Sequence, residues 1–276
     1  MLVSFPHASP LVVSLIGGLI AAGSAGAQEP SPRETLRAGL AAARAADGLG
    51  PLLSERWYEV KVERAPASAL HLCRTRGELL PGDAGLAFEV RLVEARKQDR
   101  EESTLRLELG WDGELRGFRR LSNARWRGAQ VRDAGSTLVG ERAGGELRLR
   151  VETADEEPRP VKAAPWDERT LPMEVALFLL PLLPAGPGPE LRFVSRDRIG
   201  LLAEKGAEWV WRRRPGGGVE IAEAGEDADE APRGWQVDTT GEGQERRVAR
   251  LEAGSLSLGA ISAEEAARRL AAEQGK

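Results

Sequence analysis

Over much of this chain, hydrophobic residues alternate with polar ones, which is the pattern of a strand that buries one face. The clearest case runs from Ser103 to Ser122, where leucines alternate with charged residues in the first half. The Asp112-Gly113 pair suits a tight turn, because glycine readily adopts the positive φ that such a turn needs. Apolar residues then resume at Leu115. We therefore predict a β-hairpin in this stretch.

The same alternation recurs on both sides of this hairpin. It predicts strands at 58–62, 86–92, 137–139, 147–151, 191–193, 209–211, 219–221, 235–237 and 248–251. Turn sequences such as PGDAG at 81–85 and PGGG at 215–218 separate these segments. Because strand follows strand with no long helix between them, we expect the sheet to be antiparallel.

Three segments have the character of helices instead. Ser31 to Glu34 is a capping box with proline at the first helical position, and an apolar stripe follows it at Leu36, Leu40 and Ala43. Residues 171–183, LPMEVALFLLPLL, predict a buried helix that is too short to cross a bilayer. A second capping box, at Ser262 to Glu265, opens an alanine-rich helix at the C-terminus.

These elements predict a mainly β protein, in which a curved antiparallel sheet forms an open half-barrel with N-terminal, mid-chain and C-terminal helices. We divide the chain into a signal peptide (1–27), an N-terminal helix (28–50) and the half-barrel domain with its C-terminal helix (51–276). Residues 153–170 are rich in acids and prolines, and we expect them to break the rhythm of strands.

The N-terminus has the features of an export signal. The first 28 residues contain no Asp, Glu, Lys or Arg, and the apolar run from Leu11 to Ala22 is followed by Ala25-Gly26-Ala27. Small residues at this spacing predict cleavage after Ala27 and a periplasmic or extracellular location. An uncleaved membrane anchor is the alternative, since about 18 apolar residues suffice to span a bilayer. Cys73 is the single cysteine, so an internal disulfide is excluded.

Charge and composition exclude some classes of binding partner. Charged residues make up 30% of the chain, but the formal net charge is only -4. This balance indicates an ordinary soluble surface, and together with the export signal it argues against nucleic acid as a partner.

One pair of residues could carry chemistry. His71 is the only histidine after the signal, and it stands two residues before Cys73, so a strand would place both side chains on one face. Such a pair can be a nucleophile with its base or half of a metal site. No third orienting group is evident, and zinc needs three or four ligands. We expect no catalytic residue, no metal and no cofactor, with a thiol or hydrolytic enzyme using Cys73 and His71 as the alternative.

An arginine-rich segment is the first candidate for binding. Residues 116–132 hold six arginines and no acid, interleaved with Phe118 and Trp126. Basic and aromatic residues together can contact anionic headgroups or glycans. The expected contact residues are Arg119, Arg120, Arg125 and Arg127. Pairing with acidic neighbours across a sheet is the alternative.

Tryptophan is the second candidate, because it accounts for seven of thirteen aromatic residues. Tryptophan rings either fill large cores or line apolar pockets. The residues that we expect at a hydrophobic ligand are Trp111, Trp126, Trp209 and Trp211. Core filling is the alternative for all four.

The layout also resembles a known group of proteins. The chain has a signal, a first strand of the form W-Y-x-V at Trp57 to Val60, a meander, the segment LLPLLPAG at 179–186, and a strand pair before the last helix. Over residues 55–270 this is similar to bacterial extracytoplasmic half-barrel domains related to the lipoprotein-localisation carriers, including domains found beside transglutaminase-like proteins.

The resemblance implies a curved open sheet that wraps around helices and has an apolar concave face, which holds acyl chains in the carriers. We therefore expect an exported, non-catalytic β-domain that binds a lipid or other hydrophobic ligand, or a protein partner in the cell envelope. A purely structural or interaction domain with a packed interior is the alternative.

Overall fold

The computed structural model describes residues 29–274, apart from residues 47, 64–68, 98, 128–129, 154–155, 185–187, 196–205, 216–217, 225–233 and 243–245. The predicted signal peptide lies outside the described residues. In the described part of the chain, no helix has both the length and the apolar character that crossing a membrane requires.

Within the described residues, fifteen strands form one antiparallel sheet. They are β1 (Arg56–Val62), β2 (Leu70–Leu79), β3 (Gly85–Arg96), β4 (Asp99–Gly110), β5 (Leu115–Arg127), β6 (Gln130–Asp133), β7 (Ser136–Ala143), β8 (Glu146–Thr153), β9 (Glu156–Pro165), β10 (Glu190–Ser195), β11 (Ala207–Arg213), β12 (Val219–Glu223), β13 (Gly234–Thr240), β14 (Arg247–Ala253) and β15 (Leu256–Ile261).

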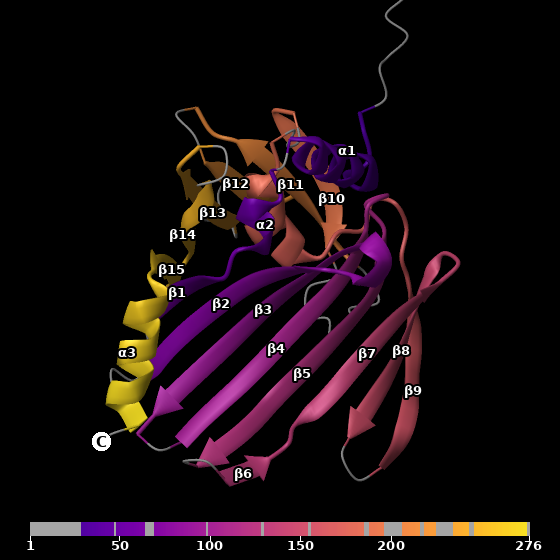
Figure 1. Cartoon of the computed structure of the whole chain (residues 1–276). Helices are drawn as coiled ribbons and strands as arrows, with labels where there is room; N and C mark the ends of the chain where they lie inside the picture. The colour runs from indigo at the N-terminus through magenta and orange to yellow at the C-terminus, as the bar shows by residue number, and fades with distance from the viewer. Residues whose placement is uncertain are drawn as a thin grey trace, which may run out of the picture.

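The predicted antiparallel sheet is confirmed, and so is the hairpin of β4 and β5. The strands run in the order β10-β11-β12-β13-β14-β15-β1-β2-β3-β4-β5-β7-β8-β9, with β6 beside β5 alone. The first strand therefore pairs with the last, from Trp57 opposite Ile261 to Val62 opposite Leu256. The two ends of the order, β9 and β10, are not paired with each other, so the curved sheet is open (Figure 1).

Strand β9 corrects the expectation that residues 153–170 break the rhythm of strands. It pairs with β8 alone and forms an edge of the sheet. An edge strand tolerates proline, because one side of its backbone needs no hydrogen-bond partner in the sheet. The prolines at 158 and 160 therefore do not prevent strand formation.

Helical segments lie on both faces of the sheet. They are α1 (Pro32–Ala45), α2 (Gly50–Leu53), η1 (Pro81–Asp83), η2 (Val175–Leu179), η3 (Leu180–Leu182) and α3 (Ala263–Gln274). Helix α1 begins with the predicted capping box at Ser31 and Glu34. Its predicted stripe is buried, and Gly39 lies close against Leu183.

Residues 171–183 occupy the inner face of the sheet, and we call them the plug. Apart from Glu174, all of them are buried. They share one hydrophobic core with α1 and with most of the strands; one such contact is between the rings of Tyr58 and Phe178, whose centroids are 5.7 Å apart. The predicted helix is present here as a π-helical turn, η2, followed by a 3-10 turn, η3. Pro181 lacks an N–H group, so a regular α-helix cannot continue through it.

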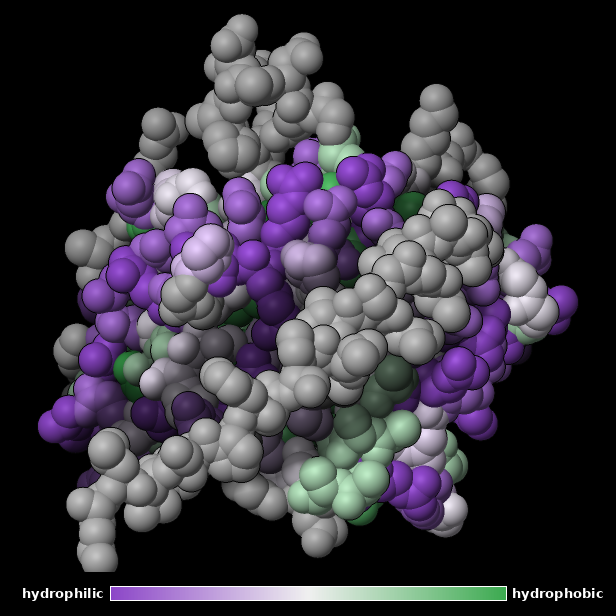
Figure 2. All heavy atoms as spheres, turned by 90° about the horizontal axis from the view of Figure 1, so that it is seen from above, coloured by the Kyte–Doolittle hydropathy of each residue, from purple (hydrophilic) through white to green (hydrophobic). Residues whose placement is uncertain are grey.

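The outer face of the sheet is covered in part by α3. Leu72 and Val93 form a small second core with Ala266 of this helix. Seen from above, the described residues on the visible face are mostly hydrophilic, with a small area of weak hydrophobicity (Figure 2).

Candidate ligand-binding surface

The plug covers only part of the inner face, as exposure along β3 shows. The inward positions of this strand alternate regularly, and exposure of their side chains rises from 0% at Leu86 to 50% at Leu92. Leu92 lies near the hairpin between β3 and β4, at the lower left of the sheet in Figure 1. The inner face is therefore filled at one end of β3 and open to solvent at the other.

A hollow of about 200 Å³ lies at this open end, and we call it the inner hollow. Its lining includes Val60, His71, Leu92, Glu94 and Ser103. Strand register explains how they meet, since His71 faces Glu94 and Leu92 faces Ser103 across neighbouring strands. The full lining has four apolar residues and three glutamates, so the hollow combines apolar surface with an acidic rim.

The predicted pair of His71 and Cys73 is brought to this region, but the environment of the thiol does not suit catalysis. Cys73 is 1% exposed, and burial, with a smaller contribution from Glu174, raises its pKa to about 12. A nucleophilic cysteine needs the opposite shift, because the thiolate is the reactive form. His71 Nδ1 lies 3.8 Å from Glu94, and its buried Nε2 has no hydrogen-bond partner among the described residues.

A metal site is not evident. Within the part of the chain that the structure describes, no three His, Cys, Asp or Glu side chains lie close enough together to hold a metal ion.

Three of the four predicted arginine contacts are paired with acids. Arg119 pairs with Glu152, Arg125 with Glu101 and Arg127 with Asp99, at 3.4, 3.1 and 3.8 Å. Glu101 and Asp99 come from the neighbouring strand β4, and Glu152 comes from β8, two strands away, so the pairing across the sheet is the one that the alternative explanation expected. These pairs leave little net positive charge for an anionic surface.

Arg120 differs from these three arginines. It lies between Leu105 of β4 and Leu138 of β7 in the register of the sheet, so it is on the same face as the core leucines. It is half-buried, and no carboxylate among the described residues forms an ion pair with it. Arg120 is therefore the one predicted arginine that is available to an anion on the inner face.

The four predicted tryptophans lie in three different places and do not line one cavity. Trp209 and Trp211 are buried in the main core, and their indole N–H groups have no described acceptor. Trp111 donates to the Asp83 carbonyl oxygen at 2.8 Å. Trp126 is half-buried and stacks with Arg100. A role of these residues in ligand binding stays a prediction.

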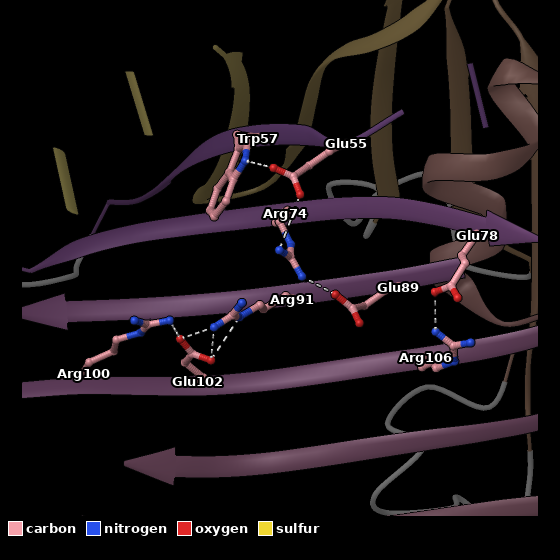
Figure 3. Close-up of polar contacts among 9 residues, drawn as sticks. All are labelled: Glu55, Trp57, Arg74, Glu78, Glu89, Arg91, Arg100, Glu102 and Arg106. Carbon is pink, nitrogen blue, oxygen red and sulfur yellow. Dashed lines mark hydrogen bonds and ion pairs between the residues drawn. The ribbon is translucent and has the colours of Figure 1, made fainter. Parts of the chain in front are cut away.

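The outer face carries an ion-pair network that sequence reasoning missed (Figure 3). Glu102 is almost fully buried there, and it accepts from Arg91 Nε at 3.0 Å and pairs with Arg100. Arg74 links Glu55 to Glu89. Apart from Glu55, these charged residues occupy outward positions of β2, β3 and β4, which alternate with the inward apolar positions. The alternation in the sequence therefore already indicated a charged outer face. Opposite charges across strands stabilise the sheet and explain much of the charged composition.

Comparisons with known proteins add little to this picture. No protein-family model matches the sequence, and no curated protein shows significant similarity to it. Among solved structures, the chain is similar to a β-barrel-like protein of the domain of unknown function DUF1849 from Brucella abortus, with a TM-score of 0.44 and 14% identity, over 76% of this chain and 95% of that one.

Proposed function

We propose that this chain is an exported, non-catalytic β-domain that binds a hydrophobic ligand, such as the acyl chain of a lipid, at the inner hollow. The observation that carries the proposal is the exposure of Leu92, an inward-facing residue in a strand whose other inward leucine and phenylalanine are buried. An apolar chain placed there gains about 0.8 kcal/mol for each buried methylene.

The size of the hollow limits how the ligand is held. Drug-sized ligands occupy pockets of roughly 300 to 1,000 Å³, whereas the inner hollow has about 200 Å³. It therefore takes only part of an acyl chain, and the remainder lies along the open sheet toward Leu138. Arg120 pairs with Leu138 in the register, so it can form an ion pair with an acidic headgroup at that end.

The absence of catalysis belongs to the same proposal. The raised pKa of Cys73 supports it, since at neutral pH the thiol stays protonated and inaccessible. An exported location is proposed from the uncharged, apolar N-terminus that ends in small residues.

A labelled fatty acid tests the ligand proposal. Leu92→Asp places a carboxylate in the hollow, and we expect it to weaken binding about tenfold or more, because apolar contact is lost and a charge would have to be buried against the acyl chain. Fluorescence titration of the purified protein measures this directly.

Leu79→Asp is the matched control. Leu79 lies on the neighbouring strand with a similar exposure, 46%, and does not line the hollow. The Leu79→Asp variant should bind the fatty acid with the same affinity as the unchanged protein. Equal weakening in both variants would show that binding is nonspecific, and a lack of saturable binding would refute the proposal.

A structural or interaction domain is the second candidate function. It is favoured by the plug, because the chain fills most of the inner face with its own side chains. The same titration separates the two, since a domain of this kind binds no fatty acid.

A further inference from the structure

A second cavity among the described residues lies where two neighbouring strands separate. Strands β14 and β15 pair only between Arg250 and Ala253 on one side and Leu256 and Gly259 on the other. Beyond this point, Val248 stays paired with β13, whereas Ile261 stays paired with β1. The two strands therefore diverge, and a cavity of about 650 Å³ occupies the opening. We call it the strand cleft.

Arg56 lines the strand cleft, and no carboxylate among the described residues forms an ion pair with it. Its Nη2 donates to the carbonyl oxygen of Arg246 at 2.9 Å and to Ser54 Oγ at 3.0 Å, and both acceptors are neutral. The buried Nη1 has no hydrogen-bond partner in the described part of the chain. A partly buried guanidinium without a carboxylate is costly, because burial penalises an unpaired charge.

A second arginine strengthens the positive character of the cleft. Arg247 also lines it and is exposed, and no described carboxylate forms an ion pair with Arg56 or Arg247. Burial lowers the pKa of the Arg56 guanidinium, Tyr58 raises it, and the nearby charge of Arg247 lowers it. The two cations thus lie close enough to repel each other, and an anion between them would relieve this repulsion.

The remaining lining suits an oxyanion with an organic group attached. Glu55 is the only acid that the described residues contribute to the lining, and it is engaged by Trp57 Nε1 at 2.8 Å and by Arg74 at 3.5 Å. Hydroxyl groups come from Ser54, Thr240 and Ser262. Helix α3 begins at this cavity, and the partial positive charge of its N-terminus is offset by Glu264 and Glu265 in its first turn, which do not line the cavity.

We propose that the strand cleft binds a phosphate-type oxyanion carried by a small organic group, with Arg56 and Arg247 as its charge partners. Arginine suits phosphate because its planar fork donates two parallel hydrogen bonds. Two arginines and several hydroxyls offer more donors than a carboxylate can use. The volume of the strand cleft lies in the range of about 300 to 1,000 Å³ that is typical of small-molecule sites. The cleft is therefore larger than a phosphate group alone, and Trp57 and Ile261 can contact the attached organic group.

Two experiments test the proposal at about 0.15 M salt, where distant charges are screened. Calorimetry measures the binding of glycerol 3-phosphate, and flotation measures binding to phosphatidylcholine vesicles that contain phosphatidylglycerol. Arg247→Gln should weaken binding about tenfold, the loss expected for one charge-assisted contact. Arg250→Gln is the matched control: Arg250 lies on the same strand outside the cleft and pairs with Glu252. Arg56→Lys keeps the charge and removes the fork, and urea unfolding of each variant checks that it is folded.

The outcomes either support the proposed anion site, and identify its ligand, or overturn it. Binding of glycerol 3-phosphate that Arg247→Gln weakens and Arg250→Gln preserves supports a soluble phosphate ester. Binding to the anionic vesicles alone, with the same pattern, supports a lipid headgroup. No binding of either probe, or equal weakening in Arg247→Gln and Arg250→Gln, would overturn the proposal. Leu92→Asp should leave this binding unchanged, so the result is independent of the fatty-acid proposal.

Discussion

At the scale of single residues, position relative to the plug decides what a side chain can do. Cys73 and Leu92 face each other across β2 and β3, yet Cys73 is buried and Leu92 is half exposed. Alternation in the sequence shows that Leu92 points inward, but it cannot show where the plug ends. That boundary depends on contacts between residues far apart in the chain, so the hollow could not be predicted from the strand pattern.

Burial of Cys73 predicts an inert thiol in the folded protein. With a pKa of about 12, the group stays protonated at pH 8, and the side chain offers no surface to a reagent. Iodoacetamide should therefore modify no cysteine in the native state and one cysteine in concentrated urea, as mass spectrometry can measure. Rapid modification of the native protein would instead favour the thiol-enzyme alternative.

The same burial predicts a loss of stability in alkaline solution. Burial raises the pKa of Cys73 from 9.0 and that of Tyr58 from 10.0, each to about 12. Both groups ionise more easily in the unfolded chain, so their contribution is fully present below about pH 9 and is lost as the pH rises toward 12. Together they account for several kcal/mol, on the order of 1.4 kcal/mol for each pKa unit.

Urea unfolding at a series of pH values measures this loss. Cys73→Ala should show a smaller decline in the free energy of unfolding between pH 9 and pH 11 than the unchanged protein. An identical decline in both proteins would show that the buried thiol is not responsible.

At the scale of elements, alternation predicted the local strands well, and long-range pairing was the part it missed. Strand β15 was not predicted, although Leu256 and Leu258 alternate with small residues there, and its partner β1 lies almost 200 positions earlier in the chain. The local pattern cannot identify a partner at that distance, because any strand edge offers the same backbone groups. Strand β9 was missed for a different reason: its prolines disfavour a central strand, and nothing local marks it as an edge.

The plug is the element whose packing matters most, and Leu179 tests this. The residue is fully buried, so Leu179→Ala should lower the free energy of unfolding by about 2 to 5 kcal/mol through lost burial and the cavity it leaves. Leu92→Ala removes the same atoms from a half-exposed position and should cost about 0.5 kcal/mol. Urea unfolding compares the two, and similar losses would contradict the placement of the plug in the core.

At the scale of the whole molecule, the plug joins the two open edges of the sheet. The chain leaves the edge strand β9, passes through the core as the plug and returns as the other edge strand, β10. The start of the plug and the residues just before it protect that edge, since Val194 donates to the Arg169 carbonyl oxygen at 2.9 Å and accepts from the backbone N–H of Leu171 at 3.0 Å. An edge covered in this way resists pairing with other chains. The β10 edge of the open sheet is therefore shielded from such pairing.

Native mass spectrometry of the protein purified without detergent from its own host tests the central claim most directly. We predict a chain that begins at Gln28 and carries the added mass of one lipid, which detergent releases and which Leu92→Asp fails to retain. A bare mass for the unchanged protein would contradict the proposed ligand site, and a chain that still begins at Met1 would contradict the proposed export.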